Sequence, residues 1–523
     1  MAKRKAAPEN TSAQVPAKKS KAKQGSANPK PEVAKPKSAL KQPQDQPKPA
    51  PTPKAKNAAP IIQPAATAVS SDGTVTLQIV AGSYDRVLHG ITATIEPSSS
   101  SDSDKPTISF ADTFLFAAHT SAIRCVALSP PSVPVPGQTQ KVMLATGATD
   151  ERINVYNLSA HPPSASSREA QRLLSAAGAP RPILENAGNR ELGTLLHHSS
   201  TVTQLAFPTR GKLLSSSEDS TIAVTRTRDW SLLSSIKAPV PKMHGRPSGD
   251  TASTGGGPQG VNSFAVHPSM KLMISVGRGE RCMRLWNLVT GKKAGVLNFG
   301  REVLEAIGEG RIGMGEGRKV VWGRGGEEYA VAFDRDVVVY GMDSKPRCRV
   351  LGAGVRTKVH EIAYVSREAE EQDVLAVSTE DGRVLFYSTK EEDLSEVEEK
   401  DGKKAVLRDA KLLAQLGGKE AGVVGRVKDF KFLAVEREDG KREWYVVTGS
   451  SDGKIRVWKV QAGDLDGEEK GKQIGTLLGT YETNNRITCV DGFVMIPRPE
   501  GVEDSDPEDE EGLEEEEDSE DSD

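Results

Sequence analysis

Apolar residues in the middle of this chain occur in short runs that either alternate with polar residues or are apolar throughout. Residues 123–128, 142–145 and 153–158 are examples, and Gly, Ser, Asp and Asn separate such runs. A period of two residues between turn signals is typical of β-strands, whereas helical periodicity is nearly absent. The pattern predicts many short antiparallel strands, as in the four-stranded blades of a propeller.

One sequence pattern recurs six times. In each copy an acidic residue stands three positions before an apolar strand whose fourth residue is Tyr, Trp or, once, Thr (Thr225). The acidic residues are Asp150, Asp219, Glu280, Asp334, Asp381 and Asp452, and the strands begin at Ile153, Ile222, Met283, Val337, Val384 and Ile455. A supersecondary unit repeated at this spacing indicates a β-propeller.

The repeats define six blades and leave strand-like runs at both ends. The expected blades are 110–158, 192–230, 231–289, 292–342, 347–389 and 411–460. The remaining runs are 75–81 and 87–95, around a turn that ends at Asp85, and 474–478 and 487–496. We expect these four runs to form a seventh blade, because a closed ring leaves no exposed strand edge. The predicted fold class is therefore all-β, a seven-bladed propeller over residues 74–496 closed by its N- and C-terminal strands.

Three segments within the propeller have the composition of insertions. Residues 159–191 are rich in Ala, Pro and Ser, residues 239–259 are rich in Gly and Pro, and residues 391–409 are a run of charges. Longer loops add little to the free energy of closing a ring, about 0.6 kcal/mol per doubling of length. We therefore predict three loops that leave the blades intact.

The acidic turn residues are predicted to be structural anchors. A carboxylate at such a turn accepts hydrogen bonds from the start of a neighbouring strand, and a charge-assisted bond contributes about 1.5–3 kcal/mol. His119 and His198 stand four residues before the strands at 123 and 202, which suits them as partners in two blades. A catalytic or metal-binding role for these histidines is the less favoured alternative. The predicted anchors are Asp85, Asp150, Asp219, Glu280, Asp334, Asp381 and Asp452.

Charge is distributed very unevenly along the chain. Residues 1–60 carry fourteen Lys and Arg against three acidic residues, whereas residues 503–523 carry fifteen acidic residues and no base. Neither segment has enough apolar residues to form a core. We predict a disordered basic arm over residues 1–70 and a disordered acidic tail over residues 500–523.

Two basic clusters in the arm fit a bipartite nuclear import signal that binds importin. The arm also suits sequence-independent, salt-sensitive contact with RNA phosphates, although it lacks aromatic residues for base stacking. Both interpretations stay open, and the first predicts a nuclear protein. The import signal comprises Lys3, Arg4, Lys5, Lys18, Lys19, Lys21 and Lys23.

The acidic tail has several possible roles. It increases solubility by self-repulsion, or it binds a basic protein such as a histone, or the protein's own basic arm. Ser505 precedes Asp506-Pro-Glu508 and is a candidate phosphosite for an acid-directed kinase. Phosphorylation would add about −1.5 to −2 charges.

Several classes of protein fit the sequence poorly. No run of eighteen apolar residues is present, so we expect neither a membrane helix nor a secretory signal. Cys125, Cys282, Cys348 and Cys489 form no C-x-x-C pair and are predicted to be reduced core thiols. The Gly-rich segment 313–319 has the wrong spacing for a phosphate-binding loop and is predicted to be a hairpin turn. We expect no catalytic, metal or cofactor site and no enzymatic activity.

An ordered set of motifs resembles one group of WD40-repeat proteins. The set comprises the opening Gly82-Ser83-Tyr84-Asp85, Phe116-Ala-Ala-His119 before Ile123-Arg-Cys-Val126, Val261-Asn-Ser-Phe264, and Met283-Arg-Leu-Trp286-Asn-Leu288 followed by Gly291-Lys. Residues 74–496 together resemble the PAK-interacting-protein family, including its fungal large-ribosomal-subunit maturation factors. Thr225 in place of an aromatic residue, Glu280 in place of Asp and the long insertions depart from the family pattern.

The resemblance implies a nucleolar scaffold for assembly of pre-60S ribosomal particles and processing of their rRNA. In animals the family also implies an adaptor that binds and inhibits a p21-activated kinase, which is our alternative function. The expected partners are pre-60S particle proteins, importin and, through the basic arm, rRNA. We expect a monomeric propeller.

Overall fold

The computed structural model describes most of residues 73–498. The gaps are 98–106, 136–137, 164–182, 185, 187, 241–259, 311–313, 353–356, 366–372, 396–398, 401–402, 405–406, 438–441 and 466–470. The chain divides into two units, Met1–Ala58 and Ala59–Asp523, and every described residue lies in the second. The predicted arm, import signal, acidic tail and Ser505 all lie outside the described residues.

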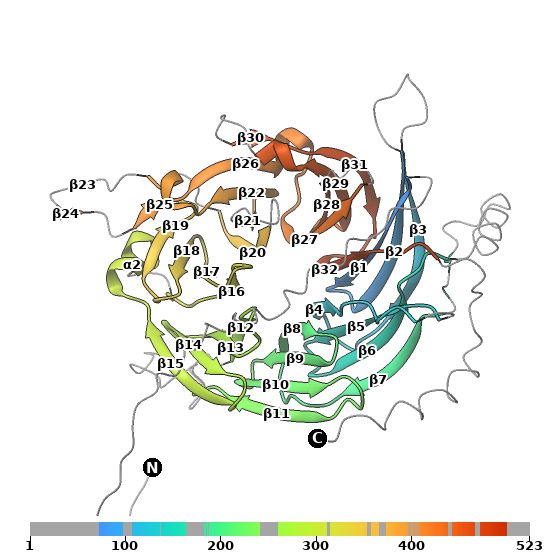
Figure 1. Cartoon of the computed structure of the whole chain (residues 1–523), viewed down its shortest axis with the longest axis horizontal. Coiled ribbons are helices and arrows are strands. Elements are labelled where there is room, and N and C mark those ends of the chain that lie inside the picture. Colours follow the sequence, from blue (N-terminus) through green and yellow to red (C-terminus); the bar gives the residue numbers. More distant parts are fainter. Residues whose placement is uncertain are drawn as a thin grey trace, which may run out of the picture. The chain divides into compact units, whose positions relative to one another are not determined.

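The described part of the second unit is a ring of seven antiparallel sheets, as the sequence predicts (Figure 1). Each sheet is one blade, and its first strand lies at the centre of the ring. Blade 1 comprises β4 (Ile123–Leu128), β5 (Lys141–Ala148), β6 (Ile153–Ser159) and β7 (Arg190–Leu195). Blade 2 comprises β8 (Val202–Thr209), β9 (Lys212–Ser217), β10 (Thr221–Arg226) and β11 (Leu232–Lys237). Blade 3 comprises β12 (Val261–Val266), β13 (Leu272–Gly277), β14 (Cys282–Asn287) and β15 (Lys292–Asn298).

The remaining blades follow the same plan. Blade 4 comprises β16 (Lys319–Trp322), β17 (Glu328–Ala332), β18 (Val337–Gly341) and β19 (Pro346–Arg349). Blade 5 comprises β20 (Val359–Val365), β21 (Val374–Thr379), β22 (Arg383–Ser388) and β26 (Lys411–Gly417). Blade 6 comprises β27 (Val427–Glu436), β28 (Arg442–Ser450), β29 (Lys454–Gln461) and β31 (Thr476–Glu482). The closing blade comprises β32 (Ile487–Val494), β1 (Val75–Ser83), β2 (Val87–Glu96) and β3 (Thr107–Ala117).

Strands from the two ends of the propeller close the ring, but the two ends contribute different numbers of strands from those expected. β32 alone comes from the C-terminal side, and it pairs antiparallel with β1 from Leu77 opposite Val494 to Ser83 opposite Ile487. β31, which contains most of the run at 474–478, instead pairs with β29 as the outer strand of blade 6. The closing blade therefore joins three N-terminal strands to one C-terminal strand, rather than two to two.

The same one-strand offset separates every predicted blade from the observed one. The first expected blade, 110–158, begins with a run at 114–116. This run lies in β3, at the outer edge of the closing blade. Likewise, 231–289 combines the outer strand of blade 2 with three strands of blade 3. The offset arises because the chain leaves each blade at its outer edge and crosses to the centre of the next. Adjacency in sequence therefore joins strands of two blades.

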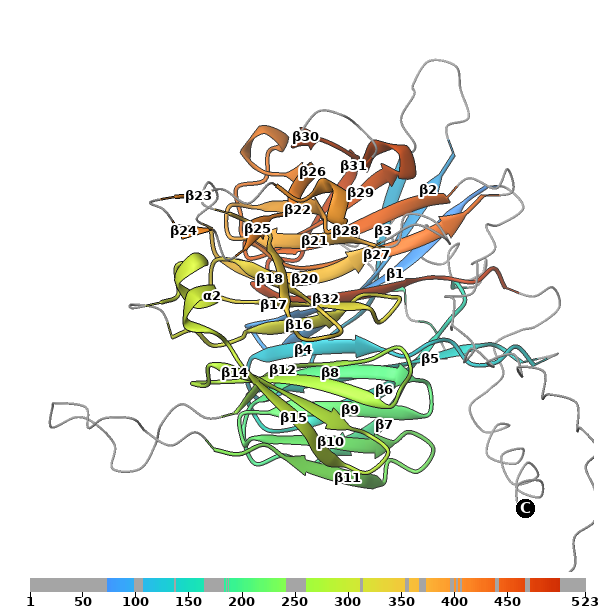
Figure 2. The same ribbon diagram turned by 60° about the vertical axis from the view of Figure 1, so that its left-hand side comes forward.

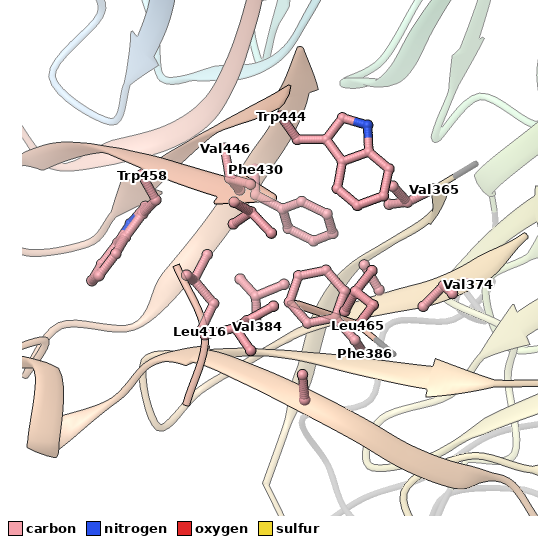
Figure 3. Close-up of a cluster of buried hydrophobic side chains, with 14 of the residues drawn as sticks. Val365, Val374, Val384, Phe386, Leu416, Phe430, Trp444, Val446, Trp458 and Leu465 are labelled. Atoms are coloured by element: carbon pink, nitrogen blue, oxygen red, sulfur yellow. The ribbon is translucent and has the colours of Figure 1, made fainter. Parts of the chain in front are cut away.

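Apolar clusters fill the spaces between neighbouring blades. The largest lies between blades 5 and 6, where Trp444 and Phe430 of blade 6 face Val365 and Phe386 of blade 5 (Figure 3). Trp444 is 2% exposed. Because strand side chains alternate between the two faces of a sheet and both faces are covered, the middle strands are buried almost throughout.

Side chains of the innermost strands also bond neighbouring blades together. The hydroxyl of Thr488 on β32 donates to the carbonyl of Ile123 at 2.7 Å. Thr203 on β8 donates to the carbonyl of Val261 at 2.6 Å. Asn262 on β12 donates to the carbonyl of Gly317 at 2.9 Å. These bonds fix the inner edges of adjacent sheets, which lack a strand partner on that side.

The insertions contribute structure to the blade edges. Segment 391–409, expected to be a loop, contains η1 (Glu391–Asp393), β23 (Glu399–Lys400), β24 (Lys403–Lys404) and β25 (Arg408–Asp409). β25 pairs parallel with β19 and so extends blade 4, where Arg349 forms an ion pair with Asp409. Segment 239–259 lies mostly outside the described residues.

Short elements complete the described chain. They are α2 (Arg301–Ala306), η2 (Lys419–Ala421), η3 (Ala462–Leu465) and β30 (Lys472–Gln473), which extends blade 5 beside β26. The helix α2 lies at the periphery of the ring (Figure 2). It is tied to β19 by Arg349, which donates to the carbonyl of Ala306 at 2.9 Å. No helix of the described residues is long and apolar enough to span a membrane.

Candidate functional site

All seven predicted anchor residues lie at one end of the ring. Each occupies the turn between the second and third strands of its blade, counted from the centre. The first strand of a blade begins at this same end, because it runs antiparallel to the second. The turns and the strand starts therefore meet, as the anchoring hypothesis requires.

Two blades contain the predicted contact between carboxylate and histidine. In blade 1, Asp150 lies 3.1 Å from Nδ1 of His119 and accepts the backbone N–H of Thr120 at 3.0 Å. His119 also contacts the hydroxyl of Thr146 on β5 through Nε2, at 2.8 Å. Burial lowers the pKa of His119 despite the neighbouring carboxylate. Such a fully bonded, buried imidazole suits a structural role.

Blade 2 repeats this arrangement. Asp219 lies 3.2 Å from Nδ1 of His198 and accepts the backbone N–H groups of Ser199 and Thr221 at 3.1 and 2.8 Å. His198 Nε2 contacts the hydroxyl of Ser215 at 2.8 Å. Burial alone would raise the pKa of Asp219, but these hydrogen bonds outweigh burial and lower it well below its usual value.

Arginine takes the place of histidine in three other blades. Glu280 pairs with Arg284, Asp381 pairs with Arg383, and Asp452 pairs with Arg456. Sequence reasoning did not find these arginines. Their common signal is a position two or four residues after the acid, on the third strand of the same blade.

Blade 4 differs from the sequence interpretation. Asp334 is only partly buried and forms ion pairs with Arg318 at 2.9 Å and Lys358 at 3.1 Å. The deeply buried carboxylate of this turn is Asp336, which is 4% exposed and accepts the backbone N–H groups of Val337 and Leu351 at 2.8 and 2.9 Å. The repeat pattern selects Asp334 because of its spacing, which says nothing about burial.

In the closing blade Asp85 has few partners. It accepts the backbone N–H of Arg486, just before β32, at 3.0 Å. This bond adds to the pairing of β1 with β32 that closes the ring.

We expect Asp150→Ala and Asp452→Ala each to lower the free energy of unfolding by about 1–3 kcal/mol. The first change leaves His119 and a backbone N–H of Thr120 without an acceptor, and the second leaves the buried Arg456 unpaired. Thermal unfolding of the purified variants measures the effect. Asp85→Ala, which removes one backbone bond, is the matched control and should have a smaller effect. Unchanged unfolding in both test variants would show that the turn acids are not anchors.

Aromatic residues at the repeat position are buried beside the turns. Trp286 donates its indole N–H to Ser275 at 2.7 Å, and Trp458 donates to Thr448 at 3.2 Å. Thr225, the exception in the pattern, is also buried and lies opposite Leu213 and Leu232. The position therefore has a packing role.

Charged side chains also occur where the innermost strands surround the centre of the ring. Lys319 on β16 bonds Glu361 on β20 at 2.5 Å, and Lys431 on β27 bonds Asp491 on β32 at 2.7 Å. Asp429 accepts the backbone N–H of Val490 at 2.9 Å. Burial and the nearby charge of Glu361 raise the pKa of Asp429. These pairs connect neighbouring blades.

Asp336 gives a pH dependence that can be measured. Burial raises the pKa of this carboxyl to about 6, above its value in the unfolded chain, about 3.9. The folded state therefore holds the proton more tightly, so the contribution of Asp336 to stability is largest below about pH 4 and falls as pH rises to about 6. We expect Asp336→Asn to flatten this decline by about 1–3 kcal/mol, as measured by urea unfolding at a series of pH values. Any pH dependence of stability that arises from Asp429 remains in this variant. Superimposable plots of the free energy of unfolding against pH for variant and parent would show that Asp336 does not cause the decline.

The described residues contain no group of three potential metal-ligating His, Cys, Asp or Glu side chains. All four cysteines are buried free thiols, as the sequence predicts, and burial raises the pKa of Cys125 and Cys348 to about 12. The described part of segment 313–319 leads from α2 into β16, so it connects blades 3 and 4 and is not the hairpin expected.

A groove of about 370 Å³ lies between the closing blade and blade 1. Leu88, Phe114, Phe116 and Tyr156 supply its apolar surface. Glu191 is the acidic residue of its lining, and the lining contains no histidine or cysteine. The groove thus offers a contact surface without a nucleophile and base.

Comparison with known proteins supports the architecture. A family model described as "WD domain, G-beta repeat" matches residues 189–224 and 438–459. The first match covers β7 to β10, and the second covers most of β28 and β29. A p21-activated protein kinase-interacting protein 1-like protein of Gallus gallus is 26% identical over 79% of both chains. Protein MAK11 of Saccharomyces cerevisiae is 27% identical over 79% of this chain and 82% of its own length.

The human p21-activated protein kinase-interacting protein 1 is 26% identical over 79% of this chain and 76% of its own length. Each alignment is long enough to include most of the ring. The chain thus contains WD40 repeats and is similar, over about 79% of its length, to relatives named PAK-interacting protein 1 and MAK11. This similarity supports the resemblance seen in the ordered blade motifs.

Proposed function

We propose that this propeller is a non-enzymatic scaffold for nucleolar assembly of the large ribosomal subunit and processing of its rRNA. The observation that carries the proposal is the similarity to Protein MAK11 across 79% of the chain, which supports a role in ribosome biogenesis. A ring whose charged and polar side chains are engaged in structural bonds suits binding better than catalysis. A propeller alone fixes no function, so the family similarity supplies the biological role.

Co-sedimentation tests this proposal directly. A tagged copy is expected to sediment with pre-60S particles in a sucrose gradient, and its depletion is expected to cause large-subunit rRNA precursors to accumulate. Expression of the full chain should reverse the accumulation. A tagged, functional copy that sediments free of ribosomal precursors would contradict the proposal.

Nuclear localisation gives a second test, which depends on the basic arm. We expect replacement of the seven basic residues of the import signal by Ala to move the protein from the nucleolus to the cytoplasm. The replaced residues are Lys3, Arg4, Lys5, Lys18, Lys19, Lys21 and Lys23. Fluorescence microscopy measures the distribution, and replacement of Lys30, Lys35, Lys37 and Lys41 is the control within the same arm. Retained nucleolar signal in the seven-residue variant would show that this segment is not the import signal.

Kinase binding is the alternative function. It is favoured by the names of several relatives, including a Shk1 kinase-binding protein 15 of Schizosaccharomyces pombe that is 24% identical over 60% of this chain. The alternative expects the purified protein to bind the regulatory segment of a p21-activated kinase and to inhibit activation. A cytosolic protein with this activity and no association with ribosomal precursors would favour the adaptor over the assembly scaffold.

A further inference from the structure

The starts of the seven innermost strands form a polar ring at the end of the propeller that carries the turn acids. In six blades a register shift near the start of this strand leaves a residue outside the regular pairing with the second strand. In blade 4 the first residue of β16 occupies the corresponding place. In blade 5 the shift spans two residues, His360 and the acidic Glu361. Apart from Glu361, the residues at these seven places are polar or basic. They are Arg124, Thr203, Asn262, Lys319, His360, Lys428 and Thr488.

Cations gather on one side of this ring. Lys428 Nζ on β27 lies 3.3 Å from His360 Nε2 on β20. Burial and the cations Lys428, Lys358, Arg426 and Arg318 lower the pKa of His360 to about 4. The histidine is therefore neutral near pH 7, and its surroundings are strongly positive.

Carboxylates neutralise only part of the cluster. Arg318 and Lys358 share Asp334, Arg426 pairs with Glu380 at 3.1 Å, and Lys319 pairs with Glu361. Asp429 contributes to the fields at Lys319 and Lys431.

At or just before the starts of the innermost strands, Lys428, Arg486 and Arg124 form no ion pair with a carboxylate of the described residues. They come from three successive blades, since β27 adjoins β32 and β32 adjoins β4 (Figure 1). Arg486 lies just before β32, and its guanidinium is 5.6 Å from the ring centre of Tyr84, an exposed side chain. We name Lys428, Arg486 and Arg124 the cationic arc.

We propose that the cationic arc binds the phosphate group of a phosphorylated segment in a partner protein. A phosphate monoester offers three acceptor oxygens and nearly two negative charges, which match guanidinium and ammonium donors on adjacent blades. Burial lowers the pKa of Lys428, and the positive charge of Arg486 lowers it further. The hydroxyl of Thr488, on the strand after Arg486, donates to the carbonyl of Ile123, next to Arg124. Tyr84 provides an apolar face for the residue next to the phosphorylated one.

Charge around the arc favours a compact anion over an extended one. The turn acids Asp85, Asp150 and Asp452 lie at the same end of the ring as the arc. An RNA backbone crossing this end would pass close to such carboxylates, and one exposed tyrosine offers little base stacking. A single phosphorylated side chain can reach the cationic arc without placing a row of phosphates beside these carboxylates.

This inference goes beyond the proposed function, because binding of a phosphorylated peptide by the purified protein does not depend on a role in ribosome assembly. Binding is measured by fluorescence polarisation with the full chain and a degenerate peptide pool centred on phosphoserine or phosphothreonine. The unphosphorylated pool and a ten-nucleotide single-stranded RNA are the comparison probes. We expect the phosphorylated pool to bind at least tenfold more tightly than the unphosphorylated pool.

Substitution tests the residues. The triple variant Arg124→Gln, Lys428→Gln and Arg486→Gln is expected to lose at least tenfold in affinity for the phosphorylated pool. Arg278→Gln is the matched control, since Arg278 lies at the same end of the ring but pairs with Glu218 at 2.9 Å. Arg124→Gln with Arg486→Gln, both at exposed side chains, gives a second variant if the triple variant unfolds.

Three results would overturn the proposal. Equal affinity of wild-type protein for the two peptide pools would show that phosphate is not recognised. Unchanged affinity in folded arc variants would place the phosphate elsewhere. Tighter binding of the RNA, lost in the same variants, would assign the arc to nucleic acid. None of these results bears on sedimentation with pre-60S particles, so the two proposals can fail separately.

Discussion

Ending the chain after residue 484 is expected to abolish cooperative folding of the propeller. The truncation removes β32, whose Ile487, Cys489 and Val490 are almost completely buried. Burial of one such side chain contributes about 1.5–3 kcal/mol, so the loss approaches the whole net stability of a typical protein, about 5–15 kcal/mol. It also exposes the edge of β1, which pairs with β32 along most of its length. Circular dichroism during heating should therefore show no sharp transition, and most of the protein should be insoluble.

A chain that ends after residue 498 is the control. It lacks the sixteen acidic residues of the tail at 500–523 but retains the whole of β32. Its unfolding temperature should match that of the full chain within a few degrees. If the chain ending at 484 were soluble and unfolded sharply at a similar temperature, ring closure would not be the main source of stability.

Trp444→Ala should have the second largest effect, a loss of about 3–5 kcal/mol in the free energy of unfolding. Trp444 lies on β28, and its indole is enclosed between blades 5 and 6 with Phe430 and Val365 nearby (Figure 3). Its removal leaves a cavity that the two rigid sheets cannot close, because sheet positions are fixed by their ladders and by the ring. We expect the apparent melting temperature to fall by roughly 5–15 °C.

Tyr84→Ala is the control that shows whether stability is lost because a buried side chain is removed or because an aromatic ring is removed. Tyr84 is 59% exposed, so its loss should change stability by less than about 0.5 kcal/mol. Trp444→Phe should fall between the two, since it keeps most of the apolar contact. Equal stability of Trp444→Ala and the parent protein would show that the interface between blades 5 and 6 contributes little.

The turn acids illustrate how far the sequence alone leads. The spacing of Asp150 and Asp219 from the following strands, and of His119 and His198 from the preceding ones, was sufficient to predict both contacts. This succeeded because the partners belong to one repeating unit, in which sequence distance fixes spatial distance. Arg284 and Arg456 also lie in the same repeat as the acids with which they pair. Their ion pairs depend on how far the arginine side chain extends back to the turn, and the repeat pattern does not indicate this.

The cationic arc could not be predicted in this way. Arg124 and Arg486 are more than three hundred and sixty residues apart in sequence, and they belong to neighbouring blades only because β32 returns to the start of the ring. Their lack of carboxylate partners is a property of the packed surface. The buried Asp336, rather than Asp334, is a similar case, since burial follows from the turn geometry of blade 4.

The sequence by itself determined the fold class, the number of blades and the seven turn positions, because alternation of apolar residues and the recurring acid are local properties of each repeat. Only the tertiary structure decided which strand of each repeat belongs to which blade and how the ends share the closing sheet. The physical reason is that both depend on pairing at the sheet edges. An outer strand pairs with its own blade in space, although the next strand in sequence belongs to the next blade. β32 pairs with β1 only when the ring has formed.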